Sequence, residues 1–496
     1  MNHNEEKKIL LNGDLHLSQS NFELALLDFA ELVERNPRNI QYLTKFSVSL
    51  IRLHRYHEAE KVIEEILSID QHNLAAFLNL CSIYQATERF ESSLKSAIAA
   101  IEIDPRNHIA YNNLGVSFGE LGLKQESIEA FKIACDLAPD YFEVWINLAQ
   151  TQYQNNYYEE SLKTFEKILS SKKIREKNIA LIKYFMSFAL LQLGKVKRGF
   201  ELYEFGLNEN LPLASIRSIR KFQKPKWNGT STEQTILVWR EQGIGDEIEF
   251  STCLTDLIRT GNKIIYETDA RLIGLFQRIY PEILVRPEKI NMNGESYDSE
   301  YDVQIAVGSL PNLFRESVES FTGSNIRFFQ ALDNLSIKFK ERFLPYKQKK
   351  LVGICWRSGK LNQSRNRNYS VLSDWGEFAS CQNIQLVNLQ YGECEDEIIE
   401  FEEKFNCKVL RWNDVDLKND IESVVAIIEN LDCVVTAPTA VSSISANCGV
   451  KTYIIQRRSW MSLGQENYPW YKNVTVIEVP DAKLPAEMIP KVIELL

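Results

Sequence analysis

Large and small residues recur with a period of 34 along the first 175 residues of the chain. Five windows show the pattern: 6–39, 40–73, 74–107, 108–141 and 142–175. Position 4 of each window is large and apolar or aromatic, and positions 8 and 20 are small. The small residues are Gly13, Ser47, Cys81, Gly115 and Ala149 at position 8, and Ala25, Ala59, Ser93, Ser127 and Ser161 at position 20. This spacing predicts two closely packed antiparallel helices in every window.

The same order of large and small residues, with a proline at position 32 in three windows, resembles the tetratricopeptide repeat. A sixth, weaker unit follows and is carried by Leu190, Gly194, Gly199 and Tyr203. Such repeats stack into a superhelix whose concave groove binds an extended peptide or a partner helix. We therefore expect an α-solenoid over residues 1–206 with a protein or peptide as its partner.

Position 6 is asparagine in three successive windows, at Asn79, Asn113 and Asn147. This position falls on the helix that lines the groove, so the three amides would form a short ladder. An amide both donates and accepts hydrogen bonds, so a ladder can hold a peptide backbone without reading its sequence. The arrangement is similar to that of O-GlcNAc transferases, whose repeats hold the acceptor polypeptide. The alternative is that these asparagines are simply solvated.

The pattern changes after residue 206. Residues 207–233 are polar and rich in turn formers, which is typical of a linker. From residue 234 short apolar runs such as TILVWR, LVGICW and LDCVVT alternate with amphipathic helical segments. This alternation predicts parallel sheets covered by helices. We expect two Rossmann-like α/β lobes, 234–340 and 350–496, that face each other across a cleft as in the GT-B architecture.

Histidine and cysteine usage limits the chemistry that the two lobes can perform. No histidine follows His108. This excludes a Ser-His-Asp triad, a Cys-His pair and a histidine metal ligand in both lobes. The nine cysteines form no CxxC pair, so the spacing indicates neither a disulfide framework nor a zinc site. A proton acceptor in these lobes would have to be a carboxylate or another non-histidine group.

The formal net charge of −10 argues against a general electrostatic grip on nucleic acid. The N-terminal residues contain no apolar signal region, and no uncharged stretch is apolar enough to span a bilayer. Together with the scattered cysteines, these features predict a cytoplasmic protein with reduced thiols and no membrane span.

The motif WREQGIGDEIEF, residues 239–250, joins the end of a strand to the start of a helix. Ligands bind at the carboxyl ends of parallel strands, and Gly243 and Gly245 would let a ligand approach the backbone. Asp246 is either the N-cap of the helix or a general base that faces the cleft. Glu247 and Glu249 are weaker candidates for the base.

The motif CWRSGKLNQSRNRNYS, residues 355–370, follows the first strand of the second lobe. Arg357, Lys360, Arg365 and Arg367 lie within eleven residues, with no acid between them. A local basic cluster at a strand end suits a diphosphate. The alternative is an ordinary solvated basic loop.

The motif TAPTAVSSISANCGVKTYII, residues 436–455, contains a third candidate site. Thr439 is expected to cap a helix that runs to Cys448. The N–H groups at the start of that helix, together with its dipole, would bind an anion. The alternative is a plain βαβ unit with a capped helix and no ligand.

These motifs, together with KPKWNG, RNRNYS and WMSLGQENYPWY, resemble those of bacterial tetratricopeptide-repeat proteins with a glycosyltransferase domain. That domain is related to the ADP-heptose transferases and is similar in layout to O-GlcNAc transferase. The resemblance implies a metal-independent GT-B transferase that needs no cofactor and uses a nucleotide sugar. It places Gly243, Gly245 and Asp246 on the acceptor side of the cleft. The donor side would comprise Arg357, Ser358, Lys360, Arg367, Thr439 and Ala440.

The chain departs from the heptosyltransferase pattern in the third motif. Those domains often show Asp-Thr and a following histidine, where this chain has Pro438, Thr439 and Ser443. The departure argues against a heptose donor. Residues of the closing motif match the family and would pack either against the nucleotide or between the lobes: Trp460, Gly464, Pro469 and Trp470.

The sequence therefore predicts a cytoplasmic enzyme that transfers a sugar to a Ser or Thr hydroxyl of a protein recruited by the repeats. Family resemblance suggests a flagellin-like surface protein as one such acceptor. Two alternatives stay open. The chain could be a scaffold with a degenerate transferase domain, or a transferase that acts on a glycan or a lipid carrier.

Overall fold

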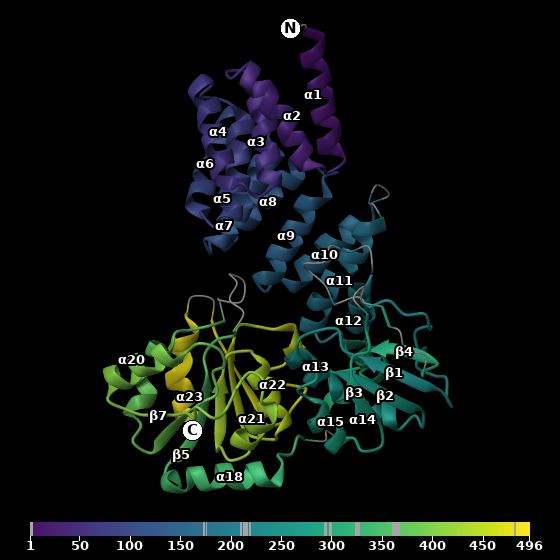
Figure 1. Ribbon diagram of the computed structural model, residues 1–496, viewed down its shortest axis with the longest axis vertical. Coiled ribbons are helices and arrows are strands. Elements are labelled where there is room, and N and C mark those ends of the chain that lie inside the picture. Colours follow the sequence, from purple (N-terminus) through teal and green to yellow (C-terminus); the bar gives the residue numbers. More distant parts are fainter. Residues whose placement is uncertain are drawn as a thin grey trace. The chain divides into compact units, whose positions relative to one another are not determined.

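The computed structural model describes residues 3–171, 174, 176–208, 211, 217, 220–291, 295–296, 300–322, 328–359, 368–480 and 483–496. The chain divides into two compact units, Met1–Arg175 and Glu176–Leu496 (Figure 1). Among the described residues, no helix combines the length and the apolar character that crossing a membrane requires.

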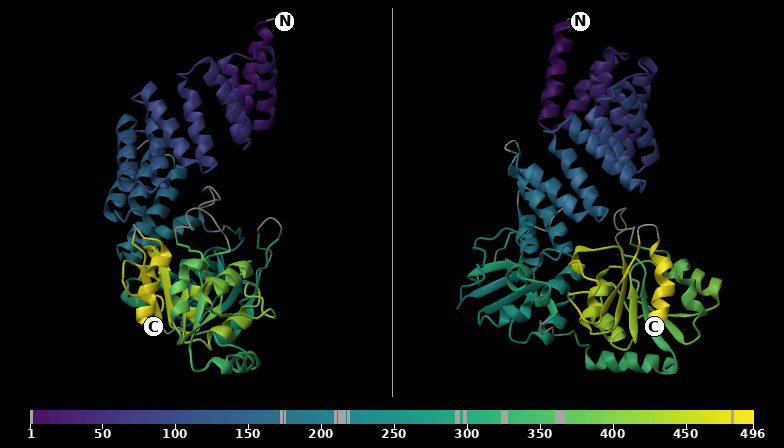
Figure 2. Two further views of the ribbon diagram at one scale, coloured as in Figure 1. Left: turned by 90° about the vertical axis from the view of Figure 1, so that its left-hand side faces the viewer. Right: turned by 180° about the vertical axis from the view of Figure 1, so that it is seen from behind.

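The first unit consists of antiparallel helix pairs that stack one after another (Figure 2). Each pair falls in one of the five windows of the sequence pattern, so the predicted solenoid is confirmed for this unit. The pairs are α1 (His3–Ser18) with α2 (Phe22–Arg35), α3 (Ile40–Arg52) with α4 (Tyr56–Ile69), α5 (Leu74–Ala86) with α6 (Phe90–Ile103), α7 (His108–Glu120) with α8 (Lys124–Leu137), and α9 (Phe142–Gln154) with α10 (Tyr158–Leu169).

The small residues lie where the two helices of a pair touch. A Cβ added to Gly13 would lie 2.7 Å from the ring of Phe29, and one added to Gly115 would lie 2.8 Å from the ring of Phe131. The hydroxyl of Ser127, at position 20, donates to the carbonyl of Gly115, at position 8, over 2.7 Å. Larger side chains at these positions would therefore push the helices apart.

Asparagine side chains start the first helix of successive pairs. Asn39, Asn73 and Asn107 each accept a hydrogen bond from a backbone N–H in the first turn of α3, α5 and α7. N-terminal N–H groups have no partner inside their own helix, so a side-chain acceptor there stabilises the helix start. These caps recur with the repeat period at the starts of α3, α5 and α7.

The second unit opens with another helix pair, α11 (Glu176–Gln192) and α12 (Val196–Tyr203), followed by the short 3-10 helix η1 (Glu204–Leu207). Tyr184 and Leu191 of α11 and Phe200 and Tyr203 of α12 belong to the same buried cluster as the strands that follow. The predicted sixth repeat is thus a helix pair whose apolar side chains pack in the core of the second unit.

Several residues of the segment predicted as a linker, 207–233, are buried against the first sheet. The backbone N–H of Trp227 donates to the carbonyl of Gln304 over 2.8 Å, and the Trp227 ring is buried. Arg217 and Arg220 are also buried. Where this segment is described, it is part of the packed unit and is held by both apolar and charged contacts.

Two parallel sheets follow, as the alternation of strands and helices predicts. The first has the order β3-β2-β1-β4 and the second the order β10-β9-β8-β5-β6-β7. Most strand residues are buried and apolar, which is typical of parallel strands covered on both faces. The strands are β1 (Thr235–Trp239), β2 (Lys263–Thr268), β3 (Leu284–Pro287), β4 (Val303–Ala306), β5 (Lys350–Cys355), β6 (Ile384–Asn388), β7 (Val409–Leu410), β8 (Cys433–Thr436), β9 (Thr452–Gln456) and β10 (Val474–Glu478).

Helices connect and cover the strands of both sheets (Figure 1). Around the first sheet they are α13 (Ile244–Ser251), α14 (Leu254–Ile258), α15 (Ile273–Ile279), η3 (Val307–Ser309), α16 (Leu310–Phe314) and α17 (Glu319–Thr322). The connection to the second sheet contains α18 (Asp333–Phe343) and η4 (Leu344–Tyr346). Around the second sheet they are η5 (Leu372–Ser380), α20 (Glu395–Phe405), α21 (Ile421–Ile428), α22 (Ala440–Asn447), η6 (Trp460–Ser462), η7 (Pro485–Met488) and α23 (Ile489–Leu495).

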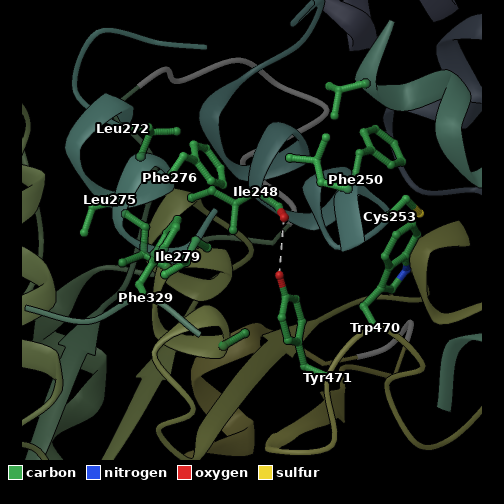
Figure 3. Packing of buried hydrophobic residues seen from close by; sticks show 14 of the residues in the cluster. Ile248, Phe250, Cys253, Leu272, Leu275, Phe276, Ile279, Phe329, Trp470 and Tyr471 are labelled. Carbon is green, nitrogen blue, oxygen red and sulfur yellow. Dashed lines mark hydrogen bonds between the residues drawn. The ribbon is translucent and has the colours of Figure 1, made fainter. Parts of the chain in front are cut away.

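One buried cluster joins the helices of the first sheet to the C-terminal part of the chain (Figure 3). The ring of Trp470 meets that of Phe250 edge to face, with the ring centres 5.6 Å apart. The hydroxyl of Tyr471 donates to the carbonyl of Ile248 over 3.4 Å. Trp470, a residue of the closing motif, therefore packs in the protein interior between the two sheets.

Gly464, also in the closing motif, offers a test of how tightly α11 is joined to this unit. Its φ is +72°, and a Cβ there would lie 2.3 Å from the carbonyl oxygen of Gln192 at the end of α11. We expect Gly464→Ala to lower the free energy of unfolding by about 2–4 kcal/mol. Both the strain of a left-handed alanine and the clash of its Cβ with the carbonyl of Gln192 contribute. Urea denaturation of the full chain measures the change.

Gly261 provides the matched control, since its φ is +77° and a Cβ there meets nothing within 4 Å. Gly261→Ala should lower the free energy of unfolding by about 1–2 kcal/mol, because only the strain of a left-handed alanine contributes. Equal losses in the two variants would mean that the loop at Gly464 moves away from α11 freely.

Candidate functional site

A cavity of about 770 Å³ lies in the second unit, between the start of α13 and the strand ends of the second sheet. Six of the residues that the sequence assigned to the acceptor and donor sides line it together. They are Gly243, Gly245 and Asp246 from the α13 segment, and Ser358, Thr439 and Ala440 from the second sheet. The structure thus brings three separate sequence motifs to one place.

The topology of the second sheet explains why the cavity opens there. Strands β5 and β8 are neighbours, but the chain leaves β5 toward β6 and leaves β8 toward β9, in opposite directions along the sheet. The loops after Cys355 and Thr436 therefore separate and leave a crevice at the carboxyl ends of the strands. Open parallel sheets bind ligands in such crevices.

The helix start predicted at Thr439 is confirmed. Helix α22 begins at Ala440, and the Thr439 hydroxyl accepts a hydrogen bond from the N–H of Val441 over 3.2 Å. The first residues of α22 line the cavity, so the positive end of the helix dipole faces it. This arrangement suits an anion.

Asp246 is not the cap of its helix, so that alternative is wrong. Helix α13 begins at Ile244 with Gly243 in the N-cap position, and Asp246 is its third residue. Its side chain is half-buried and lines the cavity. A carboxylate in the first turn of a helix interacts favourably with the helix dipole.

Gly245 allows α13 and α22 to lie against each other. A Cβ at this position would lie 3.2 Å from the hydroxyl oxygen of Ser443 and 3.6 Å from the Cα of Ala440. The sequence interpretation assigned this glycine to close approach by a ligand. In the structure the close neighbour is helix α22. Because Gly245 has no side chain, α13 and α22, which form two walls of the cavity, can lie closer together.

The two other acids of α13 have different surroundings. Glu247 is buried against β2, where its Oε1 accepts from the hydroxyls of Tyr266 over 3.0 Å and Thr268 over 2.5 Å, and burial raises its pKa to about 7. Glu249 lines the cavity, and burial raises its pKa to about 8. Of these two, Glu249 alone lies in the cavity wall.

The basic loop after β5 is described only at its beginning. The guanidinium of Arg357 is paired with the carboxylate of Glu397, its Nε lying 3.1 Å from Oε1, and Nη2 donates to the carbonyl of Glu393. Arg357 therefore points into α20 and its preceding loop, and the cavity wall contains Ser358 instead. Lys360, Arg365 and Arg367 lie outside the described residues, so the diphosphate role of the loop stays a prediction.

Cations reach the cavity from positions that the sequence analysis did not single out. Arg240, Arg271 and Lys418 line it. Nη1 of Arg240 lies 3.3 Å from Oδ2 of Asp269, and Nε of Arg271 lies 2.8 Å from Oδ1 of the same carboxylate. Arg240 directly follows β1, and its place at a strand end was a signal that could have identified it.

Trp460 of the closing motif lines the cavity, and its ring also contacts the helix pair that opens the unit. The ring centre lies 5.6 Å from that of Phe188 in α11 and 5.4 Å from that of Tyr203 in α12. The Tyr203 hydroxyl in turn accepts from Nε2 of Gln242, the residue before Gly243, over 2.5 Å. The helix pair α11 and α12 thus supports the loop that precedes α13, the helix that carries Asp246.

The three asparagines of the predicted ladder differ in exposure. Asn113 is only 7% exposed, whereas Asn79 and Asn147 are half-buried. Nδ2 of Asn147 donates to Oδ1 of Asn112 on the preceding repeat over 2.9 Å. These contacts tie neighbouring repeats together, and the peptide-binding role of the ladder stays a prediction.

In the described part of the chain, histidine, cysteine, aspartate and glutamate side chains nowhere gather in groups of three or more that could hold a metal ion. The polar groups that line the cavity include carboxyl groups, hydroxyls and the side chains of Arg240, Arg271 and Lys418.

Two tetratricopeptide-repeat family models match the chain, over residues 78–142 and 142–174. They agree with the helix pairs of the first unit. The N-terminal part is a tetratricopeptide-repeat solenoid. A crystal structure of a thermophilic TPR protein of Thermus thermophilus matches 38% of this chain and 99% of its own, at 19% identity and a TM-score of 0.34. MamA from Desulfovibrio magneticus matches 33% of this chain and 93% of its own, at 19% identity and a TM-score of 0.30.

Two relatives among curated proteins extend the comparison. Protein FlbA of Caulobacter vibrioides is 27% identical over 413 residues, which cover 80% of this chain and 68% of FlbA. Human protein O-mannosyl-transferase TMTC1 is 23% identical over 175 residues, which cover 34% of this chain and 20% of TMTC1. The match to FlbA thus extends well beyond the repeats, and the chain spans about a fifth of TMTC1.

Proposed function

We propose that this protein is a metal-independent glycosyltransferase of the GT-B type, which moves a sugar from a nucleotide sugar to a Ser or Thr hydroxyl of a protein recruited by the repeats in the cytoplasm. One observation carries the proposal. A carboxylate in the first turn of α13, Asp246, and the start of α22 line a single cavity at the switch point of the second sheet.

In this mechanism the cavity has an acceptor side and a donor side. Asp246 takes the proton of the acceptor hydroxyl as its oxygen attacks the anomeric carbon of the sugar. The bond between that carbon and the diphosphate breaks, and the diphosphate leaves with the electron pair. The N–H groups at Thr439 and Ala440, the α22 dipole and the Ser358 hydroxyl stabilise the negative charge that develops. Lys360 and Arg367, from the loop after β5, add positive charge on the donor side in this proposal, whereas Arg357 is paired with Glu397.

The solenoid supplies the acceptor in this proposal. Tetratricopeptide arrays bind extended peptides, and a flagellin-like chain would be a suitable substrate. The similarity to TMTC1, which is named as a protein O-mannosyl-transferase, supports a protein acceptor. The amides of Asn79, Asn113 and Asn147 would contact the backbone of the peptide.

The acceptor assignment is tested by Asn79→Ala combined with Asn147→Ala. We expect transfer to a co-expressed protein acceptor, read by intact mass, to fall by about tenfold, because two side-chain hydrogen bonds to the peptide are lost. Gln125→Ala, at an exposed position of α8, should leave transfer unchanged. If only a glycan or lipid carrier is modified, and the asparagine changes have no effect on it, the acceptor is not a protein.

A scaffold without catalysis is the second candidate. It is favoured by the pairing of Arg357 with Glu397, which neutralises one predicted donor ligand. Thermal unfolding in the presence of UDP-, GDP-, ADP- and CMP-sugars separates the two. A transferase should be stabilised by one of these donors, since a ligand that binds the folded state shifts the unfolding equilibrium. No shift with any of the four would favour the scaffold.

A further inference from the structure

The first helices of the third, fourth and fifth pairs carry almost no charge. Helix α5 contains no Asp, Glu, Lys or Arg, α7 contains only Glu120, and α9 contains only Glu143. Their partner helices α6, α8 and α10 are of similar length and contain three, five and five charged residues. Helices at a protein surface normally present charged side chains to water. The charges of these three repeats are therefore confined almost entirely to the second helices.

The three uncharged helices lie side by side. Helix α5 contacts α7, and α7 contacts α9. Nε2 of Gln85 in α5 donates to the carbonyl of Asn113 in α7 over 3.4 Å. Nδ2 of Asn147 in α9 donates to Oδ1 of Asn112 in α7 over 2.9 Å. Side chains from three successive repeats thus form one continuous uncharged surface.

The accessible side chains of this surface are mostly amides. Asn79 and Ser82 are three residues apart on α5, and Asn147, Gln150 and Gln154 are three and four apart on α9, so each set shares one face of its helix. The side-chain amides of Asn79, Gln150 and Gln154 have no hydrogen-bond partner within the described chain. The term neutral face is used below for seven exposed or half-buried residues: Asn79, Ser82, Asn112, Val116, Asn147, Gln150 and Gln154.

The first two repeats show that the repeat fold does not require this neutrality. Lys45 of α3 occupies the same position of its window as Asn79 and Asn147. Its Nζ lies 2.6 Å from Oδ1 of Asp14 in α1, so a charged pair joins these two first helices where two amides join α7 and α9. The lack of charge is therefore a property of the third to fifth repeats.

An uncharged surface of this kind favours an uncharged partner. Amide side chains both donate and accept hydrogen bonds, so they can pair with a peptide backbone. A charged side chain pressed against the neutral face would lose water without gaining an opposite charge, which is unfavourable. A helical partner satisfies its own backbone groups and would leave the amides unused. The chemistry is thus complementary to an extended chain without charged side chains.

We propose that the neutral face binds an extended, uncharged segment of a polypeptide that is rich in Ser, Thr, Asn, Gln and Gly. The inference rests on the proposed function only in calling this polypeptide the acceptor of the sugar. Packed helices lie about 8–10 Å apart, so three of them span about 20 Å, which is the length of about six extended residues. The acceptor would therefore be recognised by a short stretch that lacks Asp, Glu, Lys and Arg.

Selection from a library of randomised peptides of about 12 residues, twice the expected length, tests the proposal on the full chain. Sequencing of the bound peptides should show Asp, Glu, Lys and Arg each depleted by about tenfold over a central stretch, because a charge there is desolvated without a partner. The neutral polar residues should be retained. This readout requires no knowledge of the natural acceptor.

A single lysine on the neutral face should change this selection. Gln154→Lys supplies a positive charge, so Asp and Glu should become enriched in the bound peptides, while Lys and Arg stay depleted. The variant should fold, because Gln154 is exposed at the end of α9, where a cation is favourable. Gln125→Lys, the same substitution at an exposed position of α8, is the matched control and should select as the wild type does. Ser82→Lys, on α5, is the second test variant.

The selections distinguish the possible partners. Enrichment of acidic or basic residues by the wild type, or of apolar residues spaced about three to four apart, would overturn the proposal in favour of a charged or a helical partner. Selection of no peptide, or the same selection by the wild type, Gln154→Lys and Ser82→Lys, would show that the neutral face is not the binding site. Self-association of the wild type that Gln154→Lys abolishes would assign the face to a second copy.

The binding site and the proposed enzyme are tested separately by this design, because the selections need neither a nucleotide sugar nor transfer. A chain that selects uncharged peptides but transfers no sugar would retain the binding site and lose the proposed function. A chain that transfers sugar to a protein but selects charged peptides would lose this inference alone.

Discussion

Asp246→Asn should lower the rate of sugar transfer by about a hundred- to ten-thousand-fold while leaving nucleotide affinity nearly unchanged at pH 7. Asparagine has the same size but cannot take the acceptor proton. No histidine follows His108, so the second unit has no imidazole to replace the carboxylate. The fold should survive, because Gly243 rather than Asp246 occupies the N-cap of α13. Initial rates with a protein acceptor, together with calorimetry of the donor product, measure both effects.

Glu316→Gln is the control for this experiment, since Glu316 follows α16 outside the cavity and its side chain is 75% exposed. It should transfer sugar at close to the wild-type rate. A wild-type rate in Asp246→Asn would remove the base from this position.

The features that could be predicted from the sequence depend on local spacing. A period of 34 located every helix pair of the first unit, because packing through small residues repeats with the chain. Strand ends followed by glycine or threonine located the cavity wall, because parallel strands place their carboxyl ends at one edge of a sheet. The cap at Thr439 follows from the residue type alone.

The features that could not be predicted depend on partners far away in the sequence. Arg357 appeared in a basic cluster, yet its charge is balanced by Glu397 on α20, forty residues later. Glu249 was a weaker candidate for the base than Asp246 in the sequence, and only the structure shows that it is buried beside Ser443 and Tyr468, where burial raises its pKa to about 8. Such pairing depends on which side chains the fold brings together. It cannot be inferred from the order of the residues along the chain.

The contacts of residues 207–233, the segment predicted as a linker, also depend on partners that are far away in the sequence. Turn formers and polar residues dominate residues 207–233, but Arg217 is held by Glu204 and Glu241 inside the second unit. A charged residue in a polar segment normally indicates exposure. Here its acidic partners come from η1 and from the loop after β1, so the charges join the last helix pair to the first sheet.

Arg217→Met should lower the free energy of unfolding of the second unit by about 3–5 kcal/mol. The guanidinium is fully buried and donates to Oε1 of Glu241 from Nε over 3.1 Å and from Nη2 over 2.8 Å. Without it, Glu241 stays buried, with the backbone N–H of Gly308 as its remaining donor among these contacts, 3.2 Å away. Tryptophan fluorescence during urea denaturation follows this unit, because only Trp145 of the eight tryptophans lies in the first.

The double variant Arg217→Met with Glu241→Met distinguishes two contributions to the free energy of unfolding. One is the stabilisation by the ion pair, and the other is the destabilisation that follows when one charge is left buried without its partner. Removing both partners should cost clearly less than the sum of the two single changes, since no unpaired charge remains inside. Lys197→Met is the exposed control. It breaks a pair with Glu316 in which both side chains are more than half exposed, and it should leave the transition where it is. Additive losses at Arg217 and Glu241 would instead show that the two charges do not stabilise each other.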